Sequence, residues 1–182
     1  MTQGSKTSLA LTAALGVGAG LLANMARKAA VQAPTALAGD WAEALAAEHR
    51  VALTNFDQIE ATDQDQASRR TTLLMQLKHA IGRHAFQEEN TIYPALRDHG
   101  LASSEAELTQ EHATVKHFLF QLSATDRSDP QWLPTLRALR AAIEPHMAEE
   151  ENKIFPQLRE RLSGEENQAL ARAMNKEGFK LA

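Results

Sequence analysis

Apolar side chains recur at helical spacing along most of the chain, starting at Asp40. Stripes of this period face a core, and they cover four stretches, near residues 40–62, 68–98, 103–125 and 130–162. A polar run at 62–68, Gly100 and the pair Asp129-Pro130 separate the stretches, with Gly100 expected to end one helix and Asp129 to cap the next. The short connections predict antiparallel neighbours, and therefore an all-α, up-down four-helix bundle over residues 40–162.

Two further segments flank the predicted bundle. Residues 163–182 begin with a Ser-x-x-Glu capping box, which predicts a short C-terminal helix. Residues 7–26 are apolar and uncharged, and they belong to a predicted N-terminal apolar helical segment and linker over residues 1–35. Three interpretations stay open: a helix packed on its own domain or in a homo-oligomer contact, a membrane anchor, and a signal peptide. We expect a cytoplasmic protein, with membrane association through residues 7–26 as the alternative.

Three prolines lie inside the predicted helices, at Pro94, Pro145 and Pro156. Each removes one backbone donor and crowds the carbonyl four residues earlier. We expect kinks at these positions, with the helices continuing beyond them.

The composition restricts the chemistry that the chain can support. Its 182 residues include no cysteine, which excludes disulfides, thiolate catalysis and cysteine-ligated metals. The 19 Lys and Arg residues against 23 Asp and Glu give a net charge of −4, so we expect no nucleic-acid partner. Seven histidines are present, and any metal must therefore be held by His, Asp and Glu.

An internal repeat carries the most informative pattern in the sequence. Residues 84–98, HAFQEENTIYPALRD, and residues 146–160, HMAEEENKIFPQLRE, are identical at eight of fifteen positions. Upstream of the two copies stand His49 and His112, each directly after a glutamate. The chain is thus two copies of one helical hairpin, each offering a lone histidine and then His-x-x-x-Glu.

The spacing within each copy places the His and the Glu on one helix face. Residues four apart lie one turn apart on the same side of a helix, so each His-x-x-x-Glu can reach one metal site. Such inward-facing side chains build carboxylate-bridged metal pairs in helix bundles. The predicted metal ligands are His49, His84, Glu88, His112, His146 and Glu150.

The positions of the turns support a common layer for these residues. In an antiparallel pair, residues at one height lie equally far from the turn. The midpoint of His49 and His84 is 66.5, inside the polar run, and that of His112 and His146 is 129, beside Pro130. We therefore expect the four histidines in one layer of the core, where metal ions offset the cost of burying them.

These residues resemble the hemerythrin-like, or HHE cation-binding, family, over about residues 40–162. The resemblance implies two non-haem iron ions in a four-helix bundle, with manganese and zinc left open. It implies one iron on the first two predicted histidines and one on the last two, His49 with His84 and His112 with His146. It also implies Glu88 as a bridging carboxylate and Glu150 as the second one, with Glu151 as its rival.

One position departs from the pattern of oxygen-carrying hemerythrins, which have His-x-x-x-His on the third helix. Here Lys116 holds the second place, and His117 points about 140° away from His112. We expect Lys116 to extend into solvent, with a place near bound oxygen species as the alternative. The missing imidazole leaves an open coordination position, a feature of reactive metal sites.

The expected function is therefore O₂ or NO binding, or a response to reactive oxygen species, with O₂, NO or peroxide as the ligand. An iron store or sensor without turnover is one alternative, and a di-iron peroxidase or catalase-like oxidoreductase is another. No catalytic residue is assigned. We interpret Glu48 and Glu111 as surface charges, with orientation of a ligand as the alternative. We interpret Glu89 and Glu151 as solvated or capping residues, with a place as a ligand or next to one as the alternative, and Tyr93 as core packing.

Overall fold

The computed structural model describes residues 24–26, 28 and 39–181, so most of the predicted N-terminal segment 1–35 lies outside the described residues. Within the described part, every regular element is helical, which confirms the all-α prediction. In chain order they are α2 (Trp41–Glu60), α3 (Ala67–Gln87), η1 (Glu88–Ile92), α4 (Tyr93–Asp98), α5 (Ala102–Ala124), α6 (Trp132–Glu149), η2 (Glu150–Ile154), α7 (Phe155–Arg161) and α8 (Gly164–Leu181). Among the described helices, none is both long and apolar enough to cross a bilayer.

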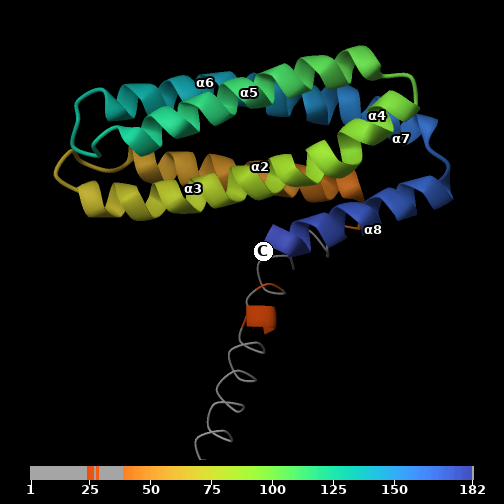
Figure 1. Ribbon diagram of the computed structural model, residues 1–182, viewed down its shortest axis with the longest axis horizontal. Coiled ribbons are helices and arrows are strands. Elements are labelled where there is room, and N and C mark those ends of the chain that lie inside the picture. The colour runs from red at the N-terminus through yellow and green to blue at the C-terminus, as the bar shows by residue number, and fades with distance from the viewer. Residues whose placement is uncertain (1–23, 27, 29–38, 182) are drawn as a thin grey trace, which may run out of the picture.

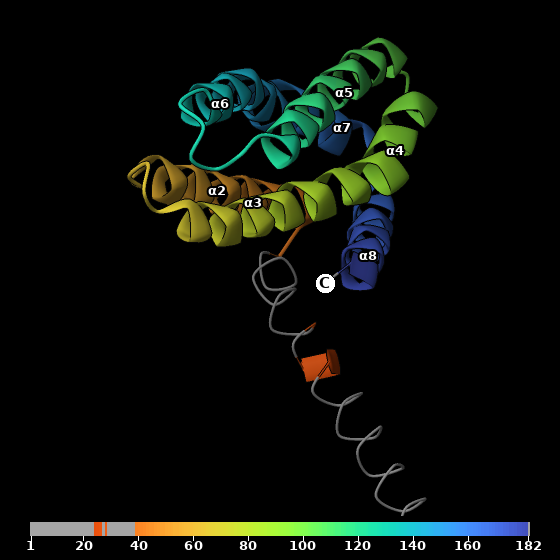
Figure 2. The same ribbon diagram turned by 60° about the vertical axis from the view of Figure 1, so that its left-hand side comes forward.

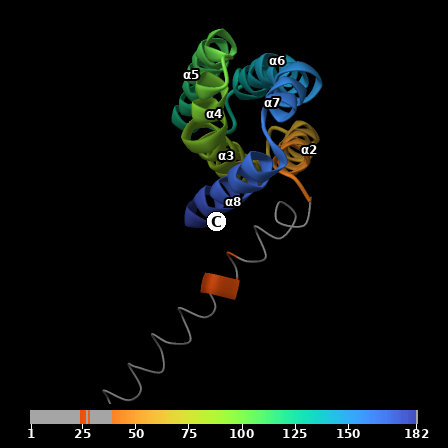
Figure 3. The ribbon, with the colours of Figure 1, turned by 90° about the vertical axis from the view of Figure 1, so that its right-hand side faces the viewer.

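The helices form a bundle of two antiparallel pairs. Figure 1 shows α2 beside α3 and α5 beside α6, with their long axes roughly aligned. The second helix of each pair is long because it continues through a π-helical turn. In the first pair α3 continues through η1 into α4, and in the second pair α6 continues through η2 into α7 (Figure 2). The C-terminal helix α8 runs obliquely across one end of the bundle and packs on α2, α3 and η1 (Figure 3).

Two apolar clusters fill the bundle, one on each side of a polar layer. The cluster near the α2–α3 and α5–α6 connections is built around residues such as Phe56, Leu77 and Trp132. The cluster near α8 includes Trp41 and Phe155, whose rings meet edge to face at a centroid distance of 5.4 Å. The histidines and glutamates of the repeat lie between the two clusters, where they are shielded from water.

Both second helices of the hairpins contain a π-helical turn, and each begins at a repeated glutamate. The N–H of Tyr93 donates to the carbonyl of Glu88, five residues back, and the N–H of Phe155 donates to that of Glu150. The prolines that follow stand in the first turn of α4 and α7, where a missing N–H is tolerated. The helices thus continue past both prolines as expected, but each does so through a wider, π-helical turn that the periodic pattern did not predict.

Local capping explains where several helices begin and end. The capping box of α8 is confirmed, because the N–H of Ser163 donates to Glu166 and the N–H of Glu166 donates to the Ser163 hydroxyl. Gly100 adopts a φ of +77°, the left-handed conformation that ends α4. The predicted start of the fourth helix at Asp129-Pro130 is wrong by two residues, because Asp129 instead closes a turn by accepting from the N–H of Trp132.

Candidate metal centre

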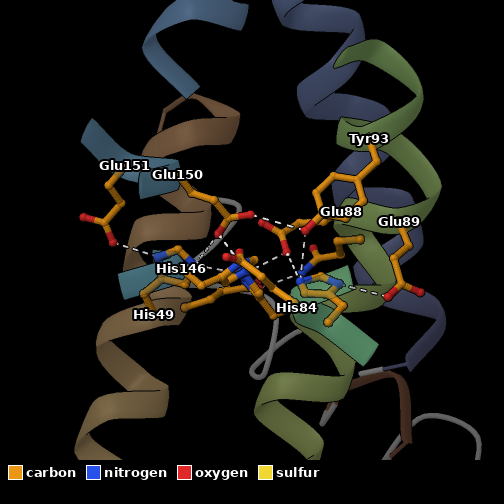
Figure 4. Close-up of polar contacts among 12 residues, drawn as sticks. His49, His84, Glu88, Glu89, Tyr93, His146, Glu150 and Glu151 are labelled. Carbon is orange, nitrogen blue, oxygen red and sulfur yellow. Dashed lines mark hydrogen bonds and ion pairs between the residues drawn. The ribbon is translucent and has the colours of Figure 1, made fainter. Parts of the chain in front are cut away.

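The structure brings all six predicted ligands together in one layer. Two sets of four side chains have ligand atoms within 4.8 Å of one another, and both sets contain the two glutamates Glu88 and Glu150. The first set adds His49 and His84, and the second adds His112 and His146. Each set could hold one metal ion, and the two glutamates common to both sets could then contact both ions (Figure 4).

The two glutamates face each other at the centre of the layer, and each lies between two imidazoles. Glu88 Oε2 is 3.1 Å from His84 Nε2 and 3.4 Å from His112 Nε2. Glu150 Oε2 is 3.4 Å from the Nε2 atoms of both His49 and His146. Each carboxylate thus contacts one imidazole from each hairpin, so the centre connects the two copies of the repeat.

The two buried carboxylates at the centre of this layer, Glu88 and Glu150, favour the binding of a cation. Both side chains, Glu88 and Glu150, have no exposed surface, and both Glu88 oxygens and Glu150 Oε2 lack a well-aligned hydrogen-bond donor. Burial raises the pKa of the Glu88 carboxyl, but the adjacent imidazoles of His84 and His112 outweigh it and hold the pKa well below its ordinary value. Burial and the Glu88 charge together raise the pKa of Glu150. Two positive ions would satisfy these oxygens, so the residues present fit a metal pair.

Each histidine is also held from its other side by a carboxylate. The four contacts join Nδ1 to a glutamate oxygen in the pairs His49–Glu151 (2.7 Å), His84–Glu48 (3.2 Å), His112–Glu89 (2.9 Å) and His146–Glu111 (2.7 Å). An imidazole that presents Nε2 to a metal carries its proton on Nδ1, which then donates to the carboxylate. These pairs therefore fix the ring orientation and the tautomer that metal binding requires.

These contacts support the alternative, that the four outer glutamates orient the histidines. The interpretation as a surface charge is wrong for the buried Glu48, whereas the side chains of Glu111 and Glu151 are also 44% and 37% exposed. Every outer contact joins two different helices, so its partner cannot be identified from spacing along one helix. A signal was present, however, because all four glutamates belong to the repeat and adjoin a predicted ligand. Glu151, the rival for the second bridge, lies on the outer side of His49 (Figure 4), and the shared position is filled by Glu150.

Glu48 differs from the other outer glutamates in its surroundings. It is 5% exposed and contacts three side chains: His84, Arg83 at 2.9 Å and Gln87 at 2.7 Å. Burial raises the pKa of Glu48, but His84 and Arg83 outweigh this effect, and the pKa lies below its ordinary value. Glu111, at the equivalent place in the second copy, has a side chain that is 44% exposed.

Tyr93 belongs to the site rather than only to the apolar core. Its hydroxyl lies 3.0 Å from His112 Nε2 and 3.4 Å from Glu150 Oε1. Burial and the charges of Glu88 and Glu150 raise the pKa of the phenol, which keeps it protonated and able to donate. The matching position in the second copy is Phe155, so the hydroxyl breaks the symmetry of the centre. This Tyr–Phe difference between the two copies was the feature of the sequence that could have indicated a role for Tyr93 in the site.

Lys116 extends from α5 toward solvent, as expected, and its side chain is 59% exposed. Its ammonium group lies 2.5 Å from Glu89, the same carboxylate that contacts His112. The lysine therefore contacts an outer carboxylate, on the far side of His112 from the shared glutamates. Beside it, a cavity of about 280 Å³ opens onto the histidine layer.

The fold and this centre define a family. Residues 41–158 match the family model of the hemerythrin HHE cation-binding domain, and the chain belongs to that family. An uncharacterised hemerythrin-like protein of Schizosaccharomyces pombe is 28% identical over 134 residues, which cover 71% of this chain and 64% of the relative. A DNA nickase of Nostoc is 29% identical over 96 residues, 53% of this chain and 27% of that protein. The chain thus spans less than two thirds of either relative, and no solved structure matches it.

Proposed function

We propose that the chain is a non-haem di-iron protein that binds O₂, NO or peroxide at an open position of a carboxylate-bridged centre. The observation that carries this proposal is the pair of four-residue sets that share two buried glutamates. Two His and shared carboxylates for each ion suit iron or manganese among the first-row metals. Iron, when bound, supplies a reversible change of redox state and a coordination position for the small ligand.

The protein residues hold and shield this centre. The four imidazoles and two carboxylates of the layer, His49, His84, Glu88, His112, His146 and Glu150, bind the ions. The outer glutamates keep each imidazole in the orientation in which Nε2 faces inward. Tyr93 donates a hydrogen bond toward Glu150, and the apolar clusters on both sides exclude bulk water.

Metal loading of paired variants tests the ligand assignment. We expect the wild-type chain, loaded with Fe(II) without air, to take up about two irons. His84→Ala should lose bound iron and stability, because it removes a ligand and takes one imidazole contact from both Glu88 and Glu48. The matched control is His79→Ala, an exposed histidine on the same helix that should keep full iron content. Full iron content and stability in His84→Ala would contradict the assignment.

Exposure of the iron-loaded protein to O₂, NO or peroxide tests the ligand. A new near-ultraviolet band upon exposure supports binding at an open position of the centre. Repeated loss of added peroxide would instead support the di-iron peroxidase or catalase-like alternative. Iron uptake without any spectral response would leave an iron store or sensor, and zinc uptake alone would refute the redox proposal.

A further inference from the structure

The cavity beside the histidine layer lies between α3, α5 and α6. The four ligand histidines contribute to its wall, and aliphatic side chains form most of the remainder, among them Ile81, Val115, Ile143 and Met147. It therefore joins a polar wall, where the candidate ligand atoms lie, to an apolar space within the bundle.

The cavity is larger than a diatomic ligand needs. Its volume is about 280 Å³. One water molecule takes about 30 Å³ in the liquid, and an apolar cavity of about 150 Å³ in another protein accepts benzene. A diatomic molecule would thus leave most of the apolar wall without contacts. The space instead suits a carbon chain of roughly six to ten non-hydrogen atoms.

A glycine stands at the opening of this cavity. Gly82 is exposed, lies within α3 and lines the space. A Cβ added there would have no neighbouring atom within 4 Å, and φ is not in the left-handed region. Helix geometry therefore does not require glycine, and glycine inside a helix is unfavourable by about 1 kcal/mol relative to alanine. Its effect at this position is to leave the opening free of a side chain.

The charged groups at the cavity wall neutralise one another. Lys116 and Glu89 both line it and form an ion pair. These two charges therefore pair with each other, and the remaining polar groups of the wall are the imidazoles, which are neutral when they hold a metal. A ligand that matches these walls has an apolar chain and a single uncharged polar end.

We propose that this cavity binds an aliphatic molecule with one polar end, such as an alcohol or an alkyl hydroperoxide. The carbon chain lies among Val115, Ile143 and Met147, the polar end lies against the histidine layer, and Gly82 leaves the entrance open. The inference rests on the proposed function in one respect, because the polar end faces the proposed metal centre.

Calorimetric titration of the iron-loaded full chain with 1-hexanol tests the inference. We expect saturable binding of one molecule to the wild type, and no binding of 1,2,6-hexanetriol, whose hydroxyls oppose the apolar wall. Gly82→Leu should weaken hexanol binding by about tenfold or more, because it places a side chain in the opening. Gly82→Ala, which suits a helix, should weaken it by a smaller factor and keeps the test valid if the leucine variant does not fold.

The matched control is Thr72→Leu, which adds a leucine to an exposed position of the same helix that does not line the cavity. It should bind hexanol as the wild type does. Absence of saturable binding to the wild type, or equal affinities in all variants, would overturn the inference. Iron content is measured in each sample, so a chain that binds iron but no hexanol refutes only the cavity ligand. A chain that binds hexanol but no iron refutes only the metal centre.

Discussion

Two glutamates at equivalent places in the repeat should differ sharply in their contribution to stability. Glu48 and Glu111 each precede a candidate ligand histidine, and each contacts Nδ1 of a histidine on another helix. Glu48 is buried and also contacts Arg83, whereas the side chain of Glu111 is 44% exposed. The same substitution, Glu→Ala, therefore removes similar atoms from two different environments.

The buried contacts set the expected magnitude for Glu48→Ala. Removing one partner of a buried ion pair costs about 3–5 kcal/mol, because the other charge stays buried without compensation. Arg83, itself buried, would lose its contact with this carboxylate, and Gln87 and His84 would each lose an acceptor. For Glu111→Ala, solvent screens the contact with His146, and we expect a loss of about 1 kcal/mol or less.

Denaturant unfolding of the metal-free variants, followed by circular dichroism, measures this difference. We expect the free energy of unfolding of Glu48→Ala to fall by at least about 2 kcal/mol more than that of Glu111→Ala. Both variants should also bind iron about 10–100-fold more weakly, because each releases one ligand histidine from its outer partner. Equal losses of stability in the two variants would refute the reasoning from burial.

Two further predictions concern pH and the phenol. Burial lowers the pKa of His84 and His112, but neighbouring carboxylates outweigh it and raise both pKa values above the ordinary value of 6.5. The contribution of these two histidines to the stability of the metal-free protein is therefore complete below pH 6.5, and it is lost as the pH rises through the raised pKa values. Because a ligand imidazole must be neutral, iron should stabilise the protein more at the upper end of this range, and thermal unfolding of both forms from pH 6 to 9 checks the opposite trends. Tyr93→Phe should change stability by about 1 kcal/mol or less and keep full iron content, since Phe155 fills the equivalent position, but it should shift the spectrum of the iron-loaded protein. An unchanged spectrum would place the hydroxyl outside the influence of the centre.

The sequence by itself determined the bundle and the inner layer of its candidate centre. Helical periodicity is a local property, and an i, i+4 spacing fixes which side chains share a helix face. Because the connections are short, distance from each turn also fixed the height of residues such as His49 and His84. The repeat then connected one half of the layer to the other.

Tertiary structure decided what depends on contacts between helices. The outer partner of each histidine comes from another helix, so Glu48 and Glu111 looked alike in sequence although only Glu48 is buried with an arginine. The π turns at Glu88 and Glu150 depend on how the chain accommodates the following prolines, and Tyr93, the residue after the first turn, contacts His112 in the histidine layer. The cavity beside Gly82 depends on the volume left between helices, which no periodic pattern specifies. Local spacing therefore determines which side chains face inward, and packing determines what they meet there.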